Sequence, residues 1–223
     1  MVMVGGHTRN IGKTSVIEGI IRAMPEMNWT AVKITQFGHG ICSINGEACD
    51  CAVTEHQFSI SDERKRDTGT DTARFFSAGA RRALWVRTRQ GELSTALASL
   101  RKEIESDEFV IVESNSLRRF IRPMLYLQVL DPLNADFKLS AQQFFDLADA
   151  YLLVTRAYGC EQLSLMKDAR VALLARELKK NKPCFHINVG EQFMSQALID
   201  FVRSRVVRST TPDLQRRDFN RIH

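Results

Sequence analysis

The sequence is poor in proline and glycine and lacks any long apolar run. Of its 223 residues only 5 are proline and 12 are glycine, while hydrophobic residues make up 44%. Disordered chains lack the apolar residues needed for a core, so this composition argues against disorder. No apolar run approaches the roughly 18 residues that a membrane-spanning helix needs. The first ten residues, MVMVGGHTRN, contain no basic segment followed by a long apolar stretch, so we expect no secretory signal.

Cysteine is also scarce, and the net charge is small. The five cysteines form an odd number. In the expected absence of a secretory signal, they favour free or metal-bound thiols in a reducing, cytoplasmic setting. Lysine and arginine total 31 against 26 acidic residues, which gives a net charge of +5. This surplus suits a protein that handles anions such as phosphates, but it is too small to indicate nucleic acid as a partner.

Short β-rich apolar segments alternate with helical patterns along the chain. Such alternation predicts an α/β fold with a doubly wound, mostly parallel sheet. We expect a single domain over residues 1–208 and a basic, flexible tail over 209–223. The expected strands are 1–4, 31–37, 83–86, 109–112, 124–130, 151–154 and 184–189, and the expected helices are 14–24, 71–80, 93–104, 163–178 and 192–202.

Residues 38–70 interrupt this alternation after the second expected strand. The stretch is polar and cysteine-bearing, and it predicts an irregular insertion with a functional reason. Thiolate and imidazole ligands suit Zn²⁺, and a tetrahedral site would stabilise a loop that lacks a core. The spacing C-x6-C-x-C-x4-H is not a standard zinc-finger spacing, so free cysteines stay the alternative. The candidate ligands are Cys42, Cys49 and Cys51, with His39 and His56 competing for the fourth position.

The strongest motif follows the first expected strand and opens the first expected helix. Its glycines let backbone N–H groups converge on an anion, and the helix N-terminus adds a positive dipole. Lys13 can reach the β- and γ-phosphates, and the Thr14 hydroxyl can ligate Mg²⁺. This context favours a site for Mg²⁺ with ATP or GTP over an ordinary turn. The candidate nucleotide contacts are Gly6, His7, Thr8, Arg9, Asn10, Ile11, Gly12, Lys13, Thr14 and Ser15.

Two carboxylates are candidate partners of this loop. Glu113 follows the apolar segment 109–112, where a carboxylate can hold Mg²⁺ directly or through water. The alternative is a solvated glutamate at a strand end. Asp71 starts an expected helix after a glycine, so it is either a helix N-cap, a group near the metal or the attacking water, or both. Lys13, Asp71 and Glu113 are therefore the candidate catalytic residues.

Three arginines follow the Glu113 segment. Arg118, Arg119 and Arg122 come after a predicted parallel strand, and ligands of open α/β sheets bind at the carboxyl ends of strands. These side chains are therefore candidates for contact with an acidic second substrate. The alternative is a solvated helix face.

Two segments resemble known families. The G-x5-G-K-T loop is similar to that of dethiobiotin synthetase, in the SIMIBI-type branch of P-loop proteins that also holds signal-recognition and MinD-type ATPases. The segment Thr68–Arg74, followed by Ala78-Gly79-Ala80, resembles the G-K-D-T-x-R…A-G-A stretch of MobB, the molybdopterin-guanine dinucleotide biosynthesis protein B family. That family also has a lysine in its second strand, as Lys33 is here. It has lysine where this chain has Thr70, and V-E-G where this chain has Val112-Glu113-Ser114.

The resemblance implies a P-loop NTP-hydrolase fold that binds a Mg²⁺-nucleotide. It also implies a role in cofactor biosynthesis, a homodimer, a place for Asp71 near the metal, and a base-reading role for Asn188. Two alternatives stay open. One is nucleotide-gated delivery of a metal or metal cofactor, and the other is a kinase or ligase acting on a small acidic metabolite.

Overall fold

The computed structural model describes residues 1–37, 58–131, 134, 136–155, 182–188 and 194–207. The five candidate zinc ligands, the expected helix 163–178 and the tail 209–223 lie outside these residues. The statements below refer to this part of the chain.

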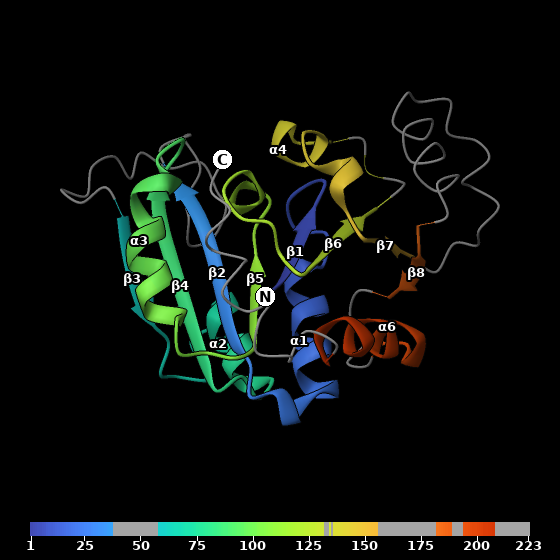
Figure 1. The fold of residues 1–223 in the computed structure, drawn as a ribbon, viewed down its shortest axis with the longest axis horizontal. Coiled ribbons are helices and arrows are strands. Elements are labelled where there is room, and N and C mark those ends of the chain that lie inside the picture. The colour runs from blue at the N-terminus through green and yellow to red at the C-terminus, as the bar shows by residue number, and fades with distance from the viewer. Residues whose placement is uncertain (38–57, 132–133, 135, 156–181, 189–193, 208–223) are drawn as a thin grey trace.

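The described residues form one sheet in the order β3-β4-β2-β5-β1-β6-β7-β8 (Figure 1). All neighbouring strands are parallel except β3, which runs antiparallel to β4 at the edge. The predicted doubly wound, mostly parallel sheet is therefore confirmed. The strands are β1 (Val2–Gly6), β2 (Thr30–Phe37), β3 (Phe58–Asp62), β4 (Arg82–Arg89), β5 (Val110–Glu113), β6 (Leu125–Leu130), β7 (Ala150–Val154) and β8 (Cys184–Ile187).

The parallel strands β1, β5 and β6 end on the same side of the sheet, so their carboxyl ends lie next to one another. Every residue of β1, β5, β6 and β7 is buried, as expected for parallel strands covered on both faces. In the register, Val4 of β1 lies beside Glu113 of β5, and Gly6 lies beside Val129 of β6. The loop after β1 therefore emerges next to the Glu113 carboxylate.

Helices cover both faces of the sheet. One apolar cluster joins the sheet to α1, α2 and α6, and a second joins the opposite face to α3, η2 and η3. Figure 1 shows α3 on the opposite side of the sheet from α1 and α2. None of these helices combines the length and apolar character needed to cross a membrane. The helices are α1 (Lys13–Ala23), η1 (Pro25–Met27), α2 (Asp71–Ser77), α3 (Leu93–Ile104), η2 (Ser116–Arg119), α4 (Leu139–Gln142), η3 (Phe145–Leu147) and α6 (Gln196–Val207).

The expectation that 38–70 is irregular throughout is wrong for residues 58–62, which form β3. Phe58 and Ile60 alternate with serines and pack against the α3 side of the core. This period of two is typical of a strand with one covered face. The two serines and the following charged residues make the segment read as polar, which conceals the strand in the sequence.

Two helix boundaries also differ from expectation. Helix α2 ends at Ser77 rather than residue 80, and Gly79 then adopts φ 109°, a left-handed conformation that commonly follows a helix end. Helix α6 spans 196–207 rather than 192–202. Val202 and Val206 are both buried against the core, so the apolar stripe continues one turn beyond the predicted end.

Candidate functional site

The side chain of Lys13, the first residue of α1, folds back over the loop between β1 and α1. Gly12 precedes α1 with φ 94°, which favours a residue without a Cβ, and Asn10 is also left-handed with φ 53°. The Lys13 ammonium returns to the Thr8 carbonyl at 3.2 Å. No side chain caps the N-terminus of α1. The loop therefore presents unfilled N–H groups and a lysine at one point, which suits an anion.

Glu113 lies beside this loop and is not a solvated strand-end residue. It is 3% exposed. Its carboxylate accepts a hydrogen bond from the Thr14 hydroxyl at 2.9 Å and another from the Lys33 ammonium at 2.5 Å. The Lys13 ammonium lies 3.8 Å away. The alternative that Glu113 is solvated is therefore wrong, and its carboxylate joins the two lysines to Thr14.

Asp71 completes the group from α2. Its carboxylate pairs with Lys33 at 2.7 Å. The N-cap of α2 is Thr70, whose hydroxyl accepts the Ala73 N–H at 3.1 Å, so the N-cap alternative for Asp71 is wrong. Burial raises the pKa of Asp71, but Lys33 outweighs this effect and holds the pKa below its usual value. Asp71 is therefore an ionised partner of the cluster.

The threonine cap is itself fixed by Glu63. The Glu63 carboxylate accepts hydrogen bonds from the backbone N–H groups of Arg64 and Lys65 and from the hydroxyls of Thr70 and Thr72. These donors hold the pKa of Glu63 below its usual value, although partial burial opposes them. The Glu63 carboxylate therefore orders the turn before α2, which positions Asp71 at the site.

The two lysines of the cluster differ in their electrostatics. Burial lowers the pKa of Lys33, but Glu113 and Asp71 outweigh it and the net shift is upward. Burial lowers the pKa of Lys13 as well, and the attraction of Glu113 does not overcome that effect, so the net shift is downward. Lys33 is thus closely paired with two carboxylates, whereas Lys13 has only the longer contact of 3.8 Å with Glu113.

Lys138 adds a third lysine to the loop, and the sequence reasoning did not single it out. Its pKa is lowered to about 8, by burial first and then by repulsion from Lys13 and Arg9. In the region that the structure describes, its ammonium forms no hydrogen bond or ion pair. A half-buried, unpaired lysine next to other cations is costly, and a bound anion would remove the cost.

His7 fixes the segment that carries Lys138. The ring is buried, its Nδ1 accepts the Asp131 N–H at 3.3 Å, and its Nε2 lies 3.3 Å from the Asn134 carbonyl oxygen. Burial lowers the pKa of His7, which together with these bonds indicates a neutral ring protonated on Nε2. The ring also packs on Phe137, and the Lys138 N–H donates to the His7 carbonyl at 2.8 Å.

Asn115 ties the start of the loop to the end of β5. Its carboxamide accepts the Gly6 N–H at 2.9 Å and donates to the Gly6 carbonyl at 2.7 Å. The adjacent Gly5 has no room for a side chain, because a Cβ there would lie 2.5 Å from Gln128 Oε1 and 2.6 Å from Tyr126 Oη. These contacts position the loop relative to Glu113, and Asn115 was not predicted as a site residue.

The oxygen ligands of the cluster fit magnesium. The Thr14 hydroxyl lies within hydrogen-bonding distance of Glu113 and interacts with Asp71 as well. Hydroxyl and carboxylate oxygens are the donors that a hard cation such as Mg²⁺ prefers. By contrast, the described ranges contain no group of three or more histidine, cysteine, aspartate or glutamate side chains arranged to hold a metal. The candidate zinc ligands lie outside these ranges, so the zinc site stays a prediction.

Asn188 directly follows β8. Its Oδ1 accepts a hydrogen bond from the Thr155 hydroxyl at 3.0 Å. Strand β8 lies three positions from β1 in the sheet, or about 14 Å at ordinary strand spacing. Asn188 therefore stands at the same edge of the sheet as the loop, and its base-reading role stays a prediction.

Arg118, Arg119 and Arg122 lie near the amino ends of the strands, whereas the loop lies at their carboxyl ends. They line a cavity together with Met124, which precedes β6, and Pro183, which precedes β8. Residues 114–124 carry the chain from the carboxyl end of β5 back to the amino end of β6. The expectation that these arginines face a substrate at the carboxyl ends of the strands is therefore wrong.

Comparisons with known proteins support the fold. No protein-family model matches the sequence, and no curated protein matches it significantly. Among solved structures, HypB from Helicobacter pylori in complex with nickel matches with a TM-score of 0.50 and 14% sequence identity. The match covers 93% of this chain and 87% of that chain. The chain has the P-loop NTPase fold. At this identity the likeness establishes the fold alone.

Proposed function

We propose that this P-loop protein binds a Mg²⁺-nucleoside triphosphate, ATP or GTP, and cleaves or transfers its terminal phosphoryl group. The observation that carries the proposal is the convergence of three features at one point. The uncapped N-terminus of α1, the returning Lys13 and the buried pair of Thr14 with Glu113 all meet beside the loop.

Each group has a role that follows from its surroundings. The loop N–H groups and Lys13 would bind the phosphates, because both present positive charge at the loop. Thr14 and Glu113, with Asp71, would hold Mg²⁺, which supplies charge neutralisation at the phosphate oxygens when bound. Lys33 pairs with both carboxylates and fixes them in place. Catalysis would therefore depend mainly on electrostatics and positioning.

The resemblance to the MobB family supports a role in cofactor biosynthesis. Two of the features that carry the resemblance, Lys33 and Asp71, are in direct contact at 2.7 Å. A homodimer is proposed on the same resemblance. We also propose that Asn188 reads the nucleotide base, because it stands at the carboxyl edge of the sheet with the phosphate loop.

A second candidate function is nucleotide-gated delivery of a metal or metal cofactor. It is favoured by the nickel in the matching HypB structure and by the cysteines and histidines between residues 39 and 56. Affinity for Zn²⁺ or Ni²⁺ that changes at least tenfold on nucleotide binding would favour this candidate. A kinase or ligase that acts on an acidic metabolite loses support, because the arginines expected to bind that metabolite lie near the amino ends of the strands, away from the phosphate loop.

Calorimetric titration of the full chain with Mg-ATP and with Mg-GTP tests the proposed function. We expect one of the two nucleotides to bind with one site per chain, and we expect EDTA to weaken that binding. Failure of both nucleotides to bind folded protein would contradict the proposal. Release of inorganic phosphate from the bound nucleotide would then distinguish turnover from binding alone.

Lys138 provides a sharper test, because its charge costs stability in the free protein. The folded-state pKa of about 8 lies below the ordinary lysine value of 10.5, so the ionised form destabilises the fold at neutral pH. We expect Lys138→Met to raise the free energy of unfolding by about 1 kcal/mol at pH 7, after allowance for partial solvent access. This gain should shrink as the pH rises above about 8.

The same variant should bind nucleoside triphosphate about tenfold more weakly, which corresponds to one charge-assisted contact of about 1.4 kcal/mol. Wild-type affinity should fall above about pH 8, where free Lys138 loses its proton, and the variant should not show this fall. Lys138→Arg should retain the affinity, and Lys102→Met on the exposed side of α3 serves as the control. A stabilised variant with unchanged affinity would exclude Lys138 from the nucleotide site.

A further inference from the structure

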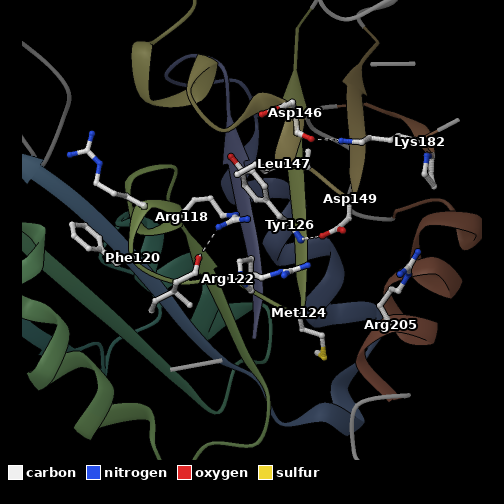
Figure 2. A pocket seen from close by; sticks show the side chains of 15 residues that line it. Arg118, Phe120, Arg122, Met124, Tyr126, Asp146, Leu147, Asp149, Lys182 and Arg205 are labelled. Carbon is white, nitrogen blue, oxygen red and sulfur yellow. Dashed lines mark hydrogen bonds between the residues drawn. The ribbon is translucent and has the colours of Figure 1, made fainter. Parts of the chain in front are cut away.

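A cavity of about 780 Å³ lies near the amino ends of β6, β7 and β8, and Figure 2 shows the side chains that line it. Its walls come from the segment that leads into β6, the turn before β7, the residues before β8, and α6. Met124 lies at the level of Met1, because its N–H donates to the Met1 carbonyl. Gly6, where the loop begins, is five residues further along β1, or about 16 Å away. The cavity is therefore separate from the proposed nucleotide site.

The lining of this cavity is strongly basic. Five cationic side chains face two acidic ones, Asp146 and Asp149. The Asp149 carboxylate already accepts the Tyr126 N–H at 2.7 Å. Figure 2 shows Arg118, Arg122 and Arg205 among the side chains that line the cavity. The cationic residues are Arg118, Arg119, Arg122, Lys182 and Arg205.

Some of these cations already have partners in the protein. Lys182 donates to the Asp146 carbonyl, and Arg119 donates to the Gln143 side chain at 3.3 Å. Arg205 lies over the ring of Phe201, with its guanidinium carbon 5.3 Å from the ring centre. These contacts leave Arg118 and Arg122 as the cations with the least compensation.

The guanidinium of Arg118 is only partly satisfied by hydrogen bonds to the described residues. One of its terminal nitrogens donates to the Ile121 carbonyl at 3.4 Å, a long hydrogen bond. Its Nε–H is buried and has no acceptor among the residues that the structure describes. Burial lowers the pKa of Arg118 and Arg122 lowers it further, while Tyr126, Asp149 and Asp146 oppose these effects without reversing the net shift. Two guanidinium groups thus repel each other in one cavity, and no carboxylate of the described residues forms an ion pair with either, so a bound anion would stabilise both.

The remaining walls are apolar and include Phe120, Met124 and Leu147. Ligand sites for small molecules combine such walls with a few convergent charges in a volume of about 300–1,000 Å³. We propose that this cavity is a second ligand site, which binds a small organic anion through Arg118 and Arg122. The ligand would carry a phosphate or carboxylate group, since both match the planar guanidinium fork. The site does not depend on nucleotide binding at the phosphate loop.

Calorimetry on the full chain tests this site with citrate as a carboxylate probe and pyrophosphate as a phosphate probe. The titrations use Lys13→Ala protein, so that a functional phosphate loop does not contribute. We expect at least one probe to bind with one site per chain. Adding Arg118→Gln and Arg122→Gln should weaken that binding at least tenfold, whereas Arg101→Gln on the exposed side of α3 should not change it. The probe that binds identifies the anionic group.

Arg122 is exposed, so Arg122→Gln alone keeps the test valid if the double variant does not fold. The single variant should still weaken probe binding severalfold, and Arg122→Lys should restore part of it. Absence of binding by both probes, or equal binding with and without the arginines, would overturn the proposal. Neither result would bear on the nucleotide site, which wild-type titration with Mg-nucleotide tests separately.

Discussion

Lys13→Ala should weaken Mg-nucleotide binding by about 100-fold, or about 2.8 kcal/mol, while leaving the protein folded. The lysine returns over the loop to the Thr8 carbonyl and would place its charge against the β- and γ-phosphates. In the free protein that charge is unfavourable, because burial lowers the pKa of Lys13 and the nearby Glu113 carboxylate does not overcome this effect. We therefore expect the melting temperature of the unliganded variant to be unchanged or higher.

Calorimetry and thermal unfolding measure the two effects on one sample. Lys102→Ala on α3 removes the same charge from an exposed position and should change neither. Adding Mg-nucleotide should raise the melting temperature of the wild type but not that of Lys13→Ala, since only binding to the folded state stabilises it. Equal affinity in both proteins would exclude the loop as the phosphate site.

Residues carried by local signals were predictable from the sequence. Lys13 and Thr14 stand in a strand–turn–helix context that is recognisable along the chain. Glu113 ends an apolar run, and that run indicates a buried parallel strand. The contacts among these three residues follow from strand register, because β1 and β5 are neighbours in the sheet.

Residues that act through tertiary contacts were not predictable. Lys138 belongs to a short segment without periodicity, and tertiary contacts of His7 and Thr8 bring it to the loop. Asn115 reads as an ordinary loop residue until its carboxamide is seen paired with Gly6. Neither position has a neighbour pattern that distinguishes it from a surface residue.

The errors have physical reasons of the same kind. Asp71 and Thr70 are both good N-cap residues, and the choice between them was decided by Lys33, which draws the Asp71 carboxylate into the site. Arg118 and Arg122 follow a strand end in the sequence. Their chain segment then returns to the amino ends of the strands, because β6 must start there to run parallel to β1. Local sequence order thus placed these arginines at the wrong end of the strands.

Glu113→Gln tests the carboxylate at the centre of the cluster. The substitution keeps the side-chain volume but leaves Lys13 and Lys33 with only Asp71 as a counter-charge. Removing one member of a buried ionic group is costly, so we expect the free energy of unfolding to fall by about 3 kcal/mol. Because a bound triphosphate supplies negative charge to the same lysines, Mg-nucleotide should recover part of this loss.

Turnover should respond more strongly than affinity. Loss of one charged group that holds the metal or orients the nucleophile is expected to slow nucleotide hydrolysis by about 100-fold, or about 2.7 kcal/mol. The dissociation constant should change less than tenfold, because the loop N–H groups and Lys13 remain. Phosphate-release assays and calorimetry measure the two quantities, with Glu105→Gln at the exposed end of α3 as the control. Undiminished hydrolysis would remove Glu113 from the reaction, and it would leave Asp71 as the carboxylate positioned to act beside Thr14.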